Sequence, residues 1–451
     1  MTNRTLTPEI QRLSQICLDK MQIDNELYQK FNVKRGLRDQ SGSGVLVGIT
    51  DISEVNSMRT IDGIRYPMNG ELFYRGYDIH DLIFGVSSES CWGYEETLYL
   101  LLFGNLPTQP ELFGFIDLFS GYRELPATFL RDILMMAPSK DLMNMMARSV
   151  LTLYSYDSYA DDISIPNVLR QCLQLTSVFP LLAVYGYQIF RHIHDGESLV
   201  IHSPSNARST AENILMMLRP DSSYTPAEAK LLDICLILHM EHGGGNNSTF
   251  TSHLLSSSGT DTYSTIAASL GSLKGVRHGG ANIKVVQMMR DLKNHITDWK
   301  DEDAIRTYLS NVLNKNAFDH SGLIYGMGHA VYSLSDPRAE ILKGFAETVS
   351  KEKKRTKEFD LYETVSRLAP QVIQGERKIF KGVSPNVDFY SGFVYELLDL
   401  PSQLYTPIFA IARMAGWSAH RIEELASNSK IMRPAYMSMS DHRIYAPIEQ
   451  R

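Results

Sequence analysis

The chain has 451 residues, which is long enough for a large hydrophobic core and for two domains. Its net charge of −7 and pI of about 6.0 provide no basic excess, which argues against nucleic acid or an anionic membrane surface as a partner. The four cysteines have no CxxC spacing, so the sequence predicts neither a zinc site nor a disulfide framework, and a reducing compartment fits.

The N-terminus and the most apolar window bear on the location of the protein. The segment MTNRTLTPEIQRLSQICLDK lacks both the apolar core of a signal peptide and the Arg-rich, acid-poor composition of a transit peptide. The most apolar window, which starts at Val178, is shorter than the roughly 20 residues that a membrane span requires. We therefore expect a cytoplasmic protein.

Short strands are predicted near the start of an otherwise helical chain. Residues 1–34 carry apolar side chains at helical spacing. The alternation at Val45–Ile49 and the run Leu72–Tyr74 predict strands around a turn near Pro67–Gly70. From Tyr77 onward helical patterns dominate, and no period of about 20 to 50 residues recurs. The predicted fold class is all-α, mainly helical, with a small β element near the N-terminus.

Three helices are predicted around two histidines that stand beside glycines. Thr225 opens a capping box for a helix that ends near His242, and the three glycines that follow let backbone amides approach a ligand. A second helix is predicted over 261–274, and a third, over 281–295, begins just after His278. The positive end of that third helix disfavours imidazolium, and a neutral histidine there can donate a hydrogen bond to an enolate oxygen. The alternative is a histidine satisfied by loop backbone.

Two later segments carry further candidates. His329 follows Gly326 and Gly328, whose backbone allows a close approach, and Arg338 comes next in the same stretch, for which a tight turn is the alternative interpretation. Asp388 begins a predicted helix, a position where an aspartate is most often an N-cap.

An arginine is predicted inside a buried helix. Arg413 lies in the apolar helix that begins at Thr406–Pro407, and Arg433 follows beyond it. A buried guanidinium without a partner costs about 3 to 5 kcal/mol, so Arg413 needs an anion. That anion is either a substrate carboxylate, which a planar guanidinium fits bidentately, or a distant Asp or Glu of the chain.

The candidates suit one kind of chemistry. Asp388 as a base and a neutral histidine as a hydrogen-bond donor would abstract a proton next to a carbonyl. The resulting carbon would then attack the ketone of a dicarboxylate substrate that the arginines hold.

Four stretches, in this order, resemble the signatures of the citrate synthase family: LILHMEHGGGNNSTFTSH, GSLKGVRHGGAN, GMGHAVY with DPRAE, and PNVDFYSGFVYELL. The similarity extends from about Arg75 to Arg433. The resemblance implies a two-domain helical fold, in which residues 1–279 and 395–451 form a large domain and residues 280–394 form a small mobile domain. Substrate binding would close the small domain and exclude water.

The resemblance also implies a role for each matching residue. Asp388 would remove a proton from the methyl group of acetyl-CoA while His278 stabilises the enol, and His329 would protonate the carbonyl of oxaloacetate. Citryl-CoA would then be hydrolysed to citrate and CoA, a reaction of the tricarboxylic acid cycle. The resemblance further implies that His242, Arg338 and Arg413 bind oxaloacetate. It implies a homodimer, in which Arg433 reaches into the partner's site. The backbone that would bind CoA is that of Ile324, Tyr325, Gly326, Met327 and Gly328. No cofactor or metal ion is implied, because the CoA thioester is a substrate.

The sequence departs from the family at one position. Many relatives carry a basic residue four positions after the histidine that matches His329, where it meets the CoA phosphate, and here that residue is Ser333. Lys378 and Lys381 are substitutes to consider. Features of the NADH-responsive bacterial branch are not identified, so control by NADH is not expected.

Three alternatives remain open. 2-Methylcitrate synthase performs the same chemistry with propionyl-CoA, and one methylene is worth only about 1 to 3 kcal/mol in a pocket. The HGGG run that begins at His242 resembles the oxyanion loop of lipases, but no G-x-S-x-G elbow occurs to supply a nucleophile. A non-catalytic helical scaffold is the third alternative.

Overall fold

The computed structural model describes residues 7–21, 23–39, 44–62, 64–89, 92–276, 278–329, 331–377, 382–427 and 430–450. It has two compact units, residues Met1–Ile49 and Thr50–Arg451. The first unit carries α1 (Pro8–Lys20), α2 (Asn25–Lys30) and a 3-10 turn at Arg35–Leu37, which confirms the helical spacing predicted there.

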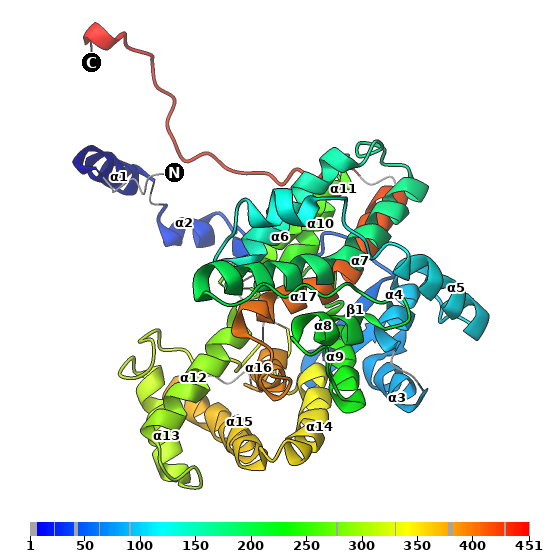
Figure 1. Ribbon diagram of the computed structural model, residues 1–451. Coiled ribbons are helices and arrows are strands. Elements are labelled where there is room, and N and C mark those ends of the chain that lie inside the picture. Colours follow the sequence, from blue (N-terminus) through cyan, green and yellow to red (C-terminus); the bar gives the residue numbers. More distant parts are fainter. Residues whose placement is uncertain are drawn as a thin grey trace. The chain divides into compact units, whose positions relative to one another are not determined.

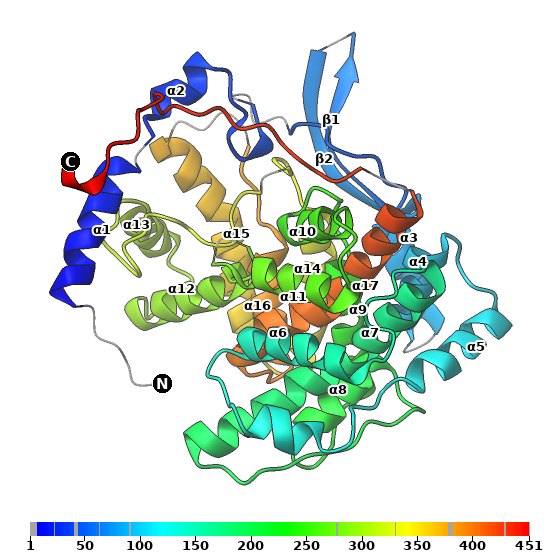
Figure 2. The same ribbon diagram turned by 90° about the horizontal axis from the view of Figure 1, so that it is seen from above.

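A three-stranded antiparallel sheet opens the second unit, in the order β1-β2-β3. β1 (Ser53–Ile61) pairs with β2 (Ile64–Tyr74), and β2 pairs with β3 (Tyr77–Asp78). Figure 2 shows the hairpin of β1 and β2 extending past the helices at one edge. Leu72 and Tyr74 are fully buried, so the β3 end of the hairpin joins the core.

Two expectations about this β element are wrong. Residues 45–50 form no strand, because Leu46 and Ile49 are almost fully exposed and have no apolar face to bury. The chain turns at Asp62, and Pro67 lies inside β2, opposite a register shift between Asn56 and Met58. A bulge tolerates a proline because it does not require every ladder hydrogen bond.

Helices make up most of the rest of the chain, as predicted, and their bounds are α3 (Ile79–Glu89), α4 (Gly93–Phe103), α5 (Gln109–Ser120), α6 (Leu142–Leu153), α7 (Ile165–Phe190), α8 (Thr210–Leu218), α9 (Pro226–His239), α10 (Asn247–Ser256), α11 (Thr262–Lys274), α12 (Ala281–His295), α13 (Glu302–Leu313), α14 (Pro337–Glu352), α15 (Thr356–Arg377), α16 (Val387–Leu397) and α17 (Tyr405–Ala426). Two π-helical turns, Leu130–Met135 and Arg191–Asp195, interrupt this series. The capping box at Thr225 and Glu228 begins α9, which confirms that start.

Helix α17 is the structural centre of the second unit. It packs against α4, α7, α9, α10 and α11, and every residue from Tyr405 to Arg421 is buried. Figure 1 shows α17 passing through the middle of these helices. This confirms the burial predicted for the helix that carries Arg413.

The apolar window that starts at Val178 belongs to a longer helical stretch than the sequence suggested. Residues Ile165–Asp195 form one continuous stretch, long and apolar enough to cross a membrane by length and composition, but 83% of its most apolar window is buried inside the protein. Such burial is equally typical of the core helix of a globular protein.

Helices α12 to α16 pack mainly on one another. α12 contacts α16, α13 contacts α15, and α14 contacts both α15 and α16, so the five helices form one group in the lower part of Figure 1. The compact unit nevertheless runs unbroken from Thr50 to Arg451. The predicted domain boundaries near residues 280 and 395 therefore stay a prediction.

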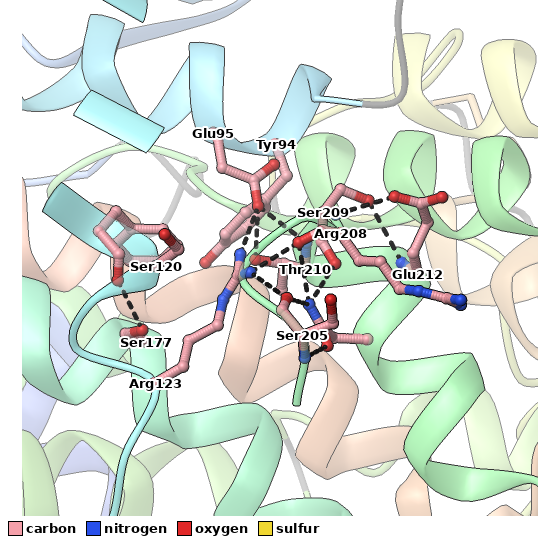
Figure 3. Close-up of polar contacts among 12 residues, drawn as sticks. Tyr94, Glu95, Ser120, Arg123, Ser177, Ser205, Arg208, Ser209, Thr210 and Glu212 are labelled. Carbon is pink, nitrogen blue, oxygen red and sulfur yellow. Dashed lines mark hydrogen bonds and ion pairs between the residues drawn. The ribbon is translucent and has the colours of Figure 1, made fainter. Parts of the chain in front are cut away.

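Glu95 of α4 forms a buried ion pair with Arg123, in the loop after α5, and hydrogen bonds with the start of α8. Nη2 of Arg123 lies 3.3 Å from Oε1 of Glu95, which also accepts hydrogen bonds from the backbone and the hydroxyl of Thr210 (Figure 3). Nη1 of Arg123 donates to the carbonyl oxygens of Ser205 and Arg208. Burial raises the pKa of Glu95, and Arg123 and Thr210 offset part of that rise.

Candidate active site

Two loops that are far apart in sequence bring His329 and Asp388 into one region. The amide of Gly328 donates to Ser384 O at 2.8 Å, and the amide of Asn386 donates to Gly326 O at 2.9 Å. Gly326 has a φ of 77°, and a Cβ atom there would lie 2.8 Å from Cγ2 of Val285. Only glycine fits this turn without strain, which accounts for the glycines before His329.

Asp388 is not the cap of its helix. The cap of α16 is Asn386, whose Oδ1 accepts from the amide of Asp388 at 3.0 Å. Oδ1 of Asp388 is buried and has no hydrogen-bond partner. Burial raises the pKa of Asp388 to about 6, with Asp336 adding to the rise and Arg338 and Arg413 opposing it. A half-buried carboxylate with this pKa suits a general base that works near neutral pH.

The ring of His329 has a defined orientation. Its Nδ1 accepts hydrogen bonds from the amides of Val331 at 3.0 Å and Tyr332 at 3.2 Å. A neutral ring with Nδ1 as acceptor carries its proton on Nε2, so the ring presents a hydrogen-bond donor there. The ring centroid lies 5.0 Å from that of His242 and 5.1 Å from that of Tyr332.

His242 is buried beside two cations. Its Nε2 has no hydrogen-bond partner. Burial lowers the pKa of His242 well below its usual value, and Arg338, His329 and Arg413 lower it further. The ring is therefore neutral at pH 7 and can exchange a hydrogen bond with a bound molecule.

The two buried arginines differ in how they are paired. Asp336 holds Arg338 by a two-pronged ion pair, from Nε to Oδ1 at 3.0 Å and from Nη2 to Oδ2 at 2.8 Å. Arg413 donates through Nε to the carbonyl of His239 at 2.9 Å and stacks over Phe409 at 4.8 Å, but Nη1 and Nη2 have no hydrogen-bond partner. Burial lowers the pKa of Arg413 to about 10, although Glu241 opposes the fall. No carboxylate of the described residues forms an ion pair with Arg413, so its two free nitrogens suit a bound anion.

His278 lies near Phe409 and Arg413. It stands three residues before α12, and its Nε2 lies 3.1 Å from Oγ of Ser248 on α10. Its ring centroid is 6.3 Å from that of Phe409, the ring over which Arg413 stacks. Burial, followed by the charge of Arg413, lowers the pKa of His278 to about 4. The imidazole is therefore neutral, in agreement with the expectation from sequence.

The CoA-binding candidates lie in the same loop as His329. Ile324 and Gly326 are buried, and Tyr325, Met327 and Gly328 are half-buried. Ser333 is buried as well, so it offers nothing to a phosphate at the surface. Lys378 and Lys381 lie outside the described residues.

Arg433 is the one site candidate that the described structure leaves apart from the others. It is exposed, in a segment, 430–450, whose only helical element is a 3-10 turn at Ile448–Gln450. Among the described residues, none is shown to fix Arg433 near His329 or Arg413, so its role in a partner's site stays a prediction.

Sequence reasoning missed four supporting residues. His239 gives its carbonyl to Arg413 and keeps a buried, unpartnered Nε2, and burial lowers its pKa to about 3. Asp336 orients Arg338, Tyr332 packs against both His242 and His329, and Ser248 contacts His278. The spacing H-x-x-H at His239 and the Asp before Pro337 were signals that could have pointed to two of them.

Other features of the described residues do not compete with this region. A cavity of about 480 Å³ lies beside Arg123, whose two terminal nitrogens already donate to protein oxygens, and one of about 370 Å³ lies between Asp132 and Arg148. Neither is lined by a candidate site residue. Within the described part of the chain, no group of three or more His, Cys, Asp or Glu side chains is placed to hold a metal ion.

The fold and the site together define a mainly helical enzyme that gathers a buried carboxylate, neutral imidazoles and buried guanidiniums around one region. The chain matches the family described as citrate synthase, C-terminal domain, over residues 41–435. It is 34% identical over 427 residues to the citrate synthase of Haloferax volcanii, covering 93% of this chain and 99% of that one. It is 31% identical to 2-methylcitrate synthase 2 of Corynebacterium glutamicum, covering 93% and 98%.

A solved structure supports the same assignment. The ternary complex of citrate synthase from Thermoplasma acidophilum with carboxymethyl coenzyme A and oxaloacetate superposes with a TM-score of 0.75 at 26% identity, covering 93% of this chain and 99% of that one. The chain therefore belongs to the citrate synthase family, and it is an enzyme of the acyltransferase class.

Proposed function

We propose that the protein condenses acetyl-CoA with oxaloacetate and hydrolyses citryl-CoA to citrate and CoA. The observation that carries this proposal is the arrangement around Asp388: a half-buried carboxylate whose Oδ1 is buried and whose pKa is raised, in one region with buried nitrogens of Arg413 and His242 that have no partner. Unpartnered buried polar atoms are costly, and a bound dicarboxylate would satisfy them.

Each residue has a role in this reaction. The free nitrogens of Arg413, together with Arg338 and His242, hold the carboxylates of oxaloacetate. Asp388 takes a proton from the thioester methyl group, and neutral His278 donates to the enol oxygen. That donation requires the ring proton on Nδ1, so the single hydroxyl proton of Ser248, which goes to Oδ1 of Asn246 at 3.0 Å, must turn to Nε2 of His278. His329 gives its Nε2 proton to the ketone as the carbon attacks. One donor to a developing oxyanion is typically worth about 3 to 4 kcal/mol of barrier.

The wider setting is also part of the proposal. The enzyme works as a cytoplasmic homodimer in the tricarboxylic acid cycle, and Arg433 completes the partner's site. The backbone at 324–328 receives the adenine of CoA. Closure of residues 280–394 over the substrates excludes water. The reaction uses no cofactor. Arg433→Ala would then lower oxaloacetate affinity, and mixing it with an Asp388→Ala chain would restore one working site in each heterodimer.

A second candidate is 2-methylcitrate synthase, which the 31% identity to the enzyme of Corynebacterium glutamicum favours. The test is thiol release from acetyl-CoA and from propionyl-CoA, each with and without oxaloacetate. A higher kcat/KM for acetyl-CoA is expected. A propionyl-CoA preference would replace the acyl donor, and no oxaloacetate-dependent release from either thioester would reject the proposed function.

A further inference from the structure

The ring of Tyr332 is buried and contacts three groups of the candidate site. It stacks on the ring of His329 at a centroid distance of 5.1 Å and meets the ring of His242 edge-on at 5.3 Å. The guanidinium of Arg338 lies over the ring, 5.9 Å from its centroid. A displacement of this one side chain would therefore disturb the candidate proton donor and two groups that would hold the substrate.

Strand β2 fixes the far end of this side chain. The hydroxyl of Tyr332 donates to the carbonyl oxygen of Glu71 at 3.0 Å, and the amide of Gly70 donates to Oγ of Ser335 at 3.2 Å. A Cβ atom on Gly70 would lie 2.4 Å from the carbonyl oxygen of Ser335 and 2.6 Å from Cδ1 of Tyr332. Only glycine fits so close to another segment, so the loop that carries His329 rests directly against the backbone of β2.

The backbone of the same tyrosine also contacts His329. The amides of Val331 and Tyr332 both donate to Nδ1 of the His329 ring. With Nδ1 as an acceptor, the neutral ring carries its proton on Nε2. Tyr332 therefore contributes to the orientation of the ring through its side chain and to the position of the ring proton through its amide.

Strand β2 is anchored on the side of His242 as well. It pairs with β1, and the hydroxyl of its last residue, Tyr74, lies 3.0 Å from the carbonyl oxygen of Glu241, the residue before His242. Helix α14, which follows the His329 loop, also packs on β2. One strand thus contacts the backbone beside His242 through Tyr74 and the loop of His329 through Glu71.

We propose that strand β2 positions the proton donor of the site through Tyr332. The ring and the amide of Tyr332 hold His329, and the hydroxyl ties their loop to Glu71. This inference rests on the proposed function, in which His329 protonates the ketone of the keto acid. Tyr332 is a positioning residue, because it acts through His329. Arg338 and Arg413 are held by other residues, so loss of the tie acts mainly on the proton donor.

The role of the hydroxyl is tested by kcat and oxaloacetate KM of Tyr332→Phe, which keeps the ring and loses the bond to Glu71. We expect kcat to fall about tenfold, because a misplaced donor stabilises the transition state less, and KM to change by less than about threefold. Tyr185→Phe is a matched control, since the hydroxyl of Tyr185 donates to the carbonyl oxygen of His202 at 3.1 Å, and its kcat should equal that of the wild type. A wild-type kcat in Tyr332→Phe would overturn the proposal.

A double-mutant cycle separates positioning from a structural role. In His329→Ala no ring is left to position, so the addition of Tyr332→Phe is expected to lower kcat by less than about twofold. A merely structural role predicts the same fold loss of kcat in both backgrounds, and that result would overturn the positioning role.

The contact between β2 and His329 is tested without substrate, by the side-chain NMR signals of the histidines in the full, unliganded protein. The His329 signals are those that are missing in His329→Ala. They are expected to shift in Gly70→Ala, whose new Cβ displaces the ring of Tyr332, and more weakly in Tyr332→Phe. They are expected to stay in place in Gly114→Ala, a control in which the new Cβ has no atom within 4 Å. Unmoved His329 signals in the first two variants would overturn the proposal. If the wild type shows no oxaloacetate turnover, the proposed function fails, and these spectra still decide whether β2 holds His329.

Discussion

Replacement of Arg413 by methionine separates substrate binding from folding. The pKa of Arg413 falls from 12.5 to about 10 on burial, and at about 1.4 kcal/mol per pKa unit this corresponds to roughly 3 kcal/mol of destabilisation of the charged form. Both folded and unfolded states are protonated at pH 7, so the penalty is present throughout the neutral range and is lost only as the pH rises above about 10.

The variant also loses favourable contacts. The hydrogen bond from Nε to His239 O is worth about 1.5 kcal/mol, and stacking over Phe409 is worth about 1 kcal/mol. These losses nearly cancel the relief of burial, so we expect Arg413→Met to change the free energy of unfolding by less than about 1 kcal/mol. Oxaloacetate affinity should fall by at least about 2 kcal/mol, roughly 30-fold, because the carboxylate loses its bidentate partner.

Arg421 on the same helix is a matched control. It is also fully buried, but its guanidinium donates to the hydroxyls of Ser256, Thr262 and Thr265 and to the carbonyl of Thr260. Arg421→Met leaves these four acceptors without their donor, so it should destabilise the protein by about 3 to 5 kcal/mol and leave the oxaloacetate affinity unchanged. The assays are urea unfolding and calorimetric titration with oxaloacetate. The reasoning is refuted if Arg413→Met is destabilised as strongly as Arg421→Met and still binds oxaloacetate like the wild type.

Three further predictions follow from pKa values and backbone geometry. Asp388 must be ionised to act as a base, so log(kcat/KM) for acetyl-CoA should fall with unit slope below about pH 6, and a flat profile down to about pH 4.5 would contradict the assignment. The pKa of His278 is about 4 in the folded protein against an ordinary value of 6.5, so between pH 4 and 6.5 the unfolded chain binds more protons and the free energy of unfolding rises with pH. His278→Asn should reduce that slope by about 1.4 kcal/mol per pH unit. An unchanged slope would contradict the burial argument. Gly326→Ala should lower the free energy of unfolding by about 2 to 4 kcal/mol, because the new Cβ would clash with its neighbours. Gly328 has a similar φ, but a Cβ there would have no atom closer than 4.0 Å, so Gly328→Ala should cost only about 1 to 2 kcal/mol. Equal losses would show that φ alone matters.

Local signals in the sequence predicted the helical elements well. The capping box at Thr225 and Glu228 acts within a few residues, so spacing alone reveals it. The apolar pattern around Arg413 correctly predicted a fully buried helix.

Features that depend on distant partners were harder to predict. The strands expected at Val45–Ile49 are absent because strand position is set by hairpin pairing and burial, and a bulge allows Pro67 inside β2. The same limit applies to the site. Asp388 could have been an N-cap by position, and only the fold shows that Asn386 takes that role. The contact of the Tyr332 hydroxyl with Glu71 joins residues 261 positions apart, so no local pattern contains it.

The central claim is that Asp388 is the base of a site whose cations hold the keto acid. Its most direct test measures thiol release and oxaloacetate binding in the same preparation of Asp388→Ala. We predict that turnover is abolished while oxaloacetate still binds, because the arginines and His242 remain in place. Full turnover by this variant would contradict the account.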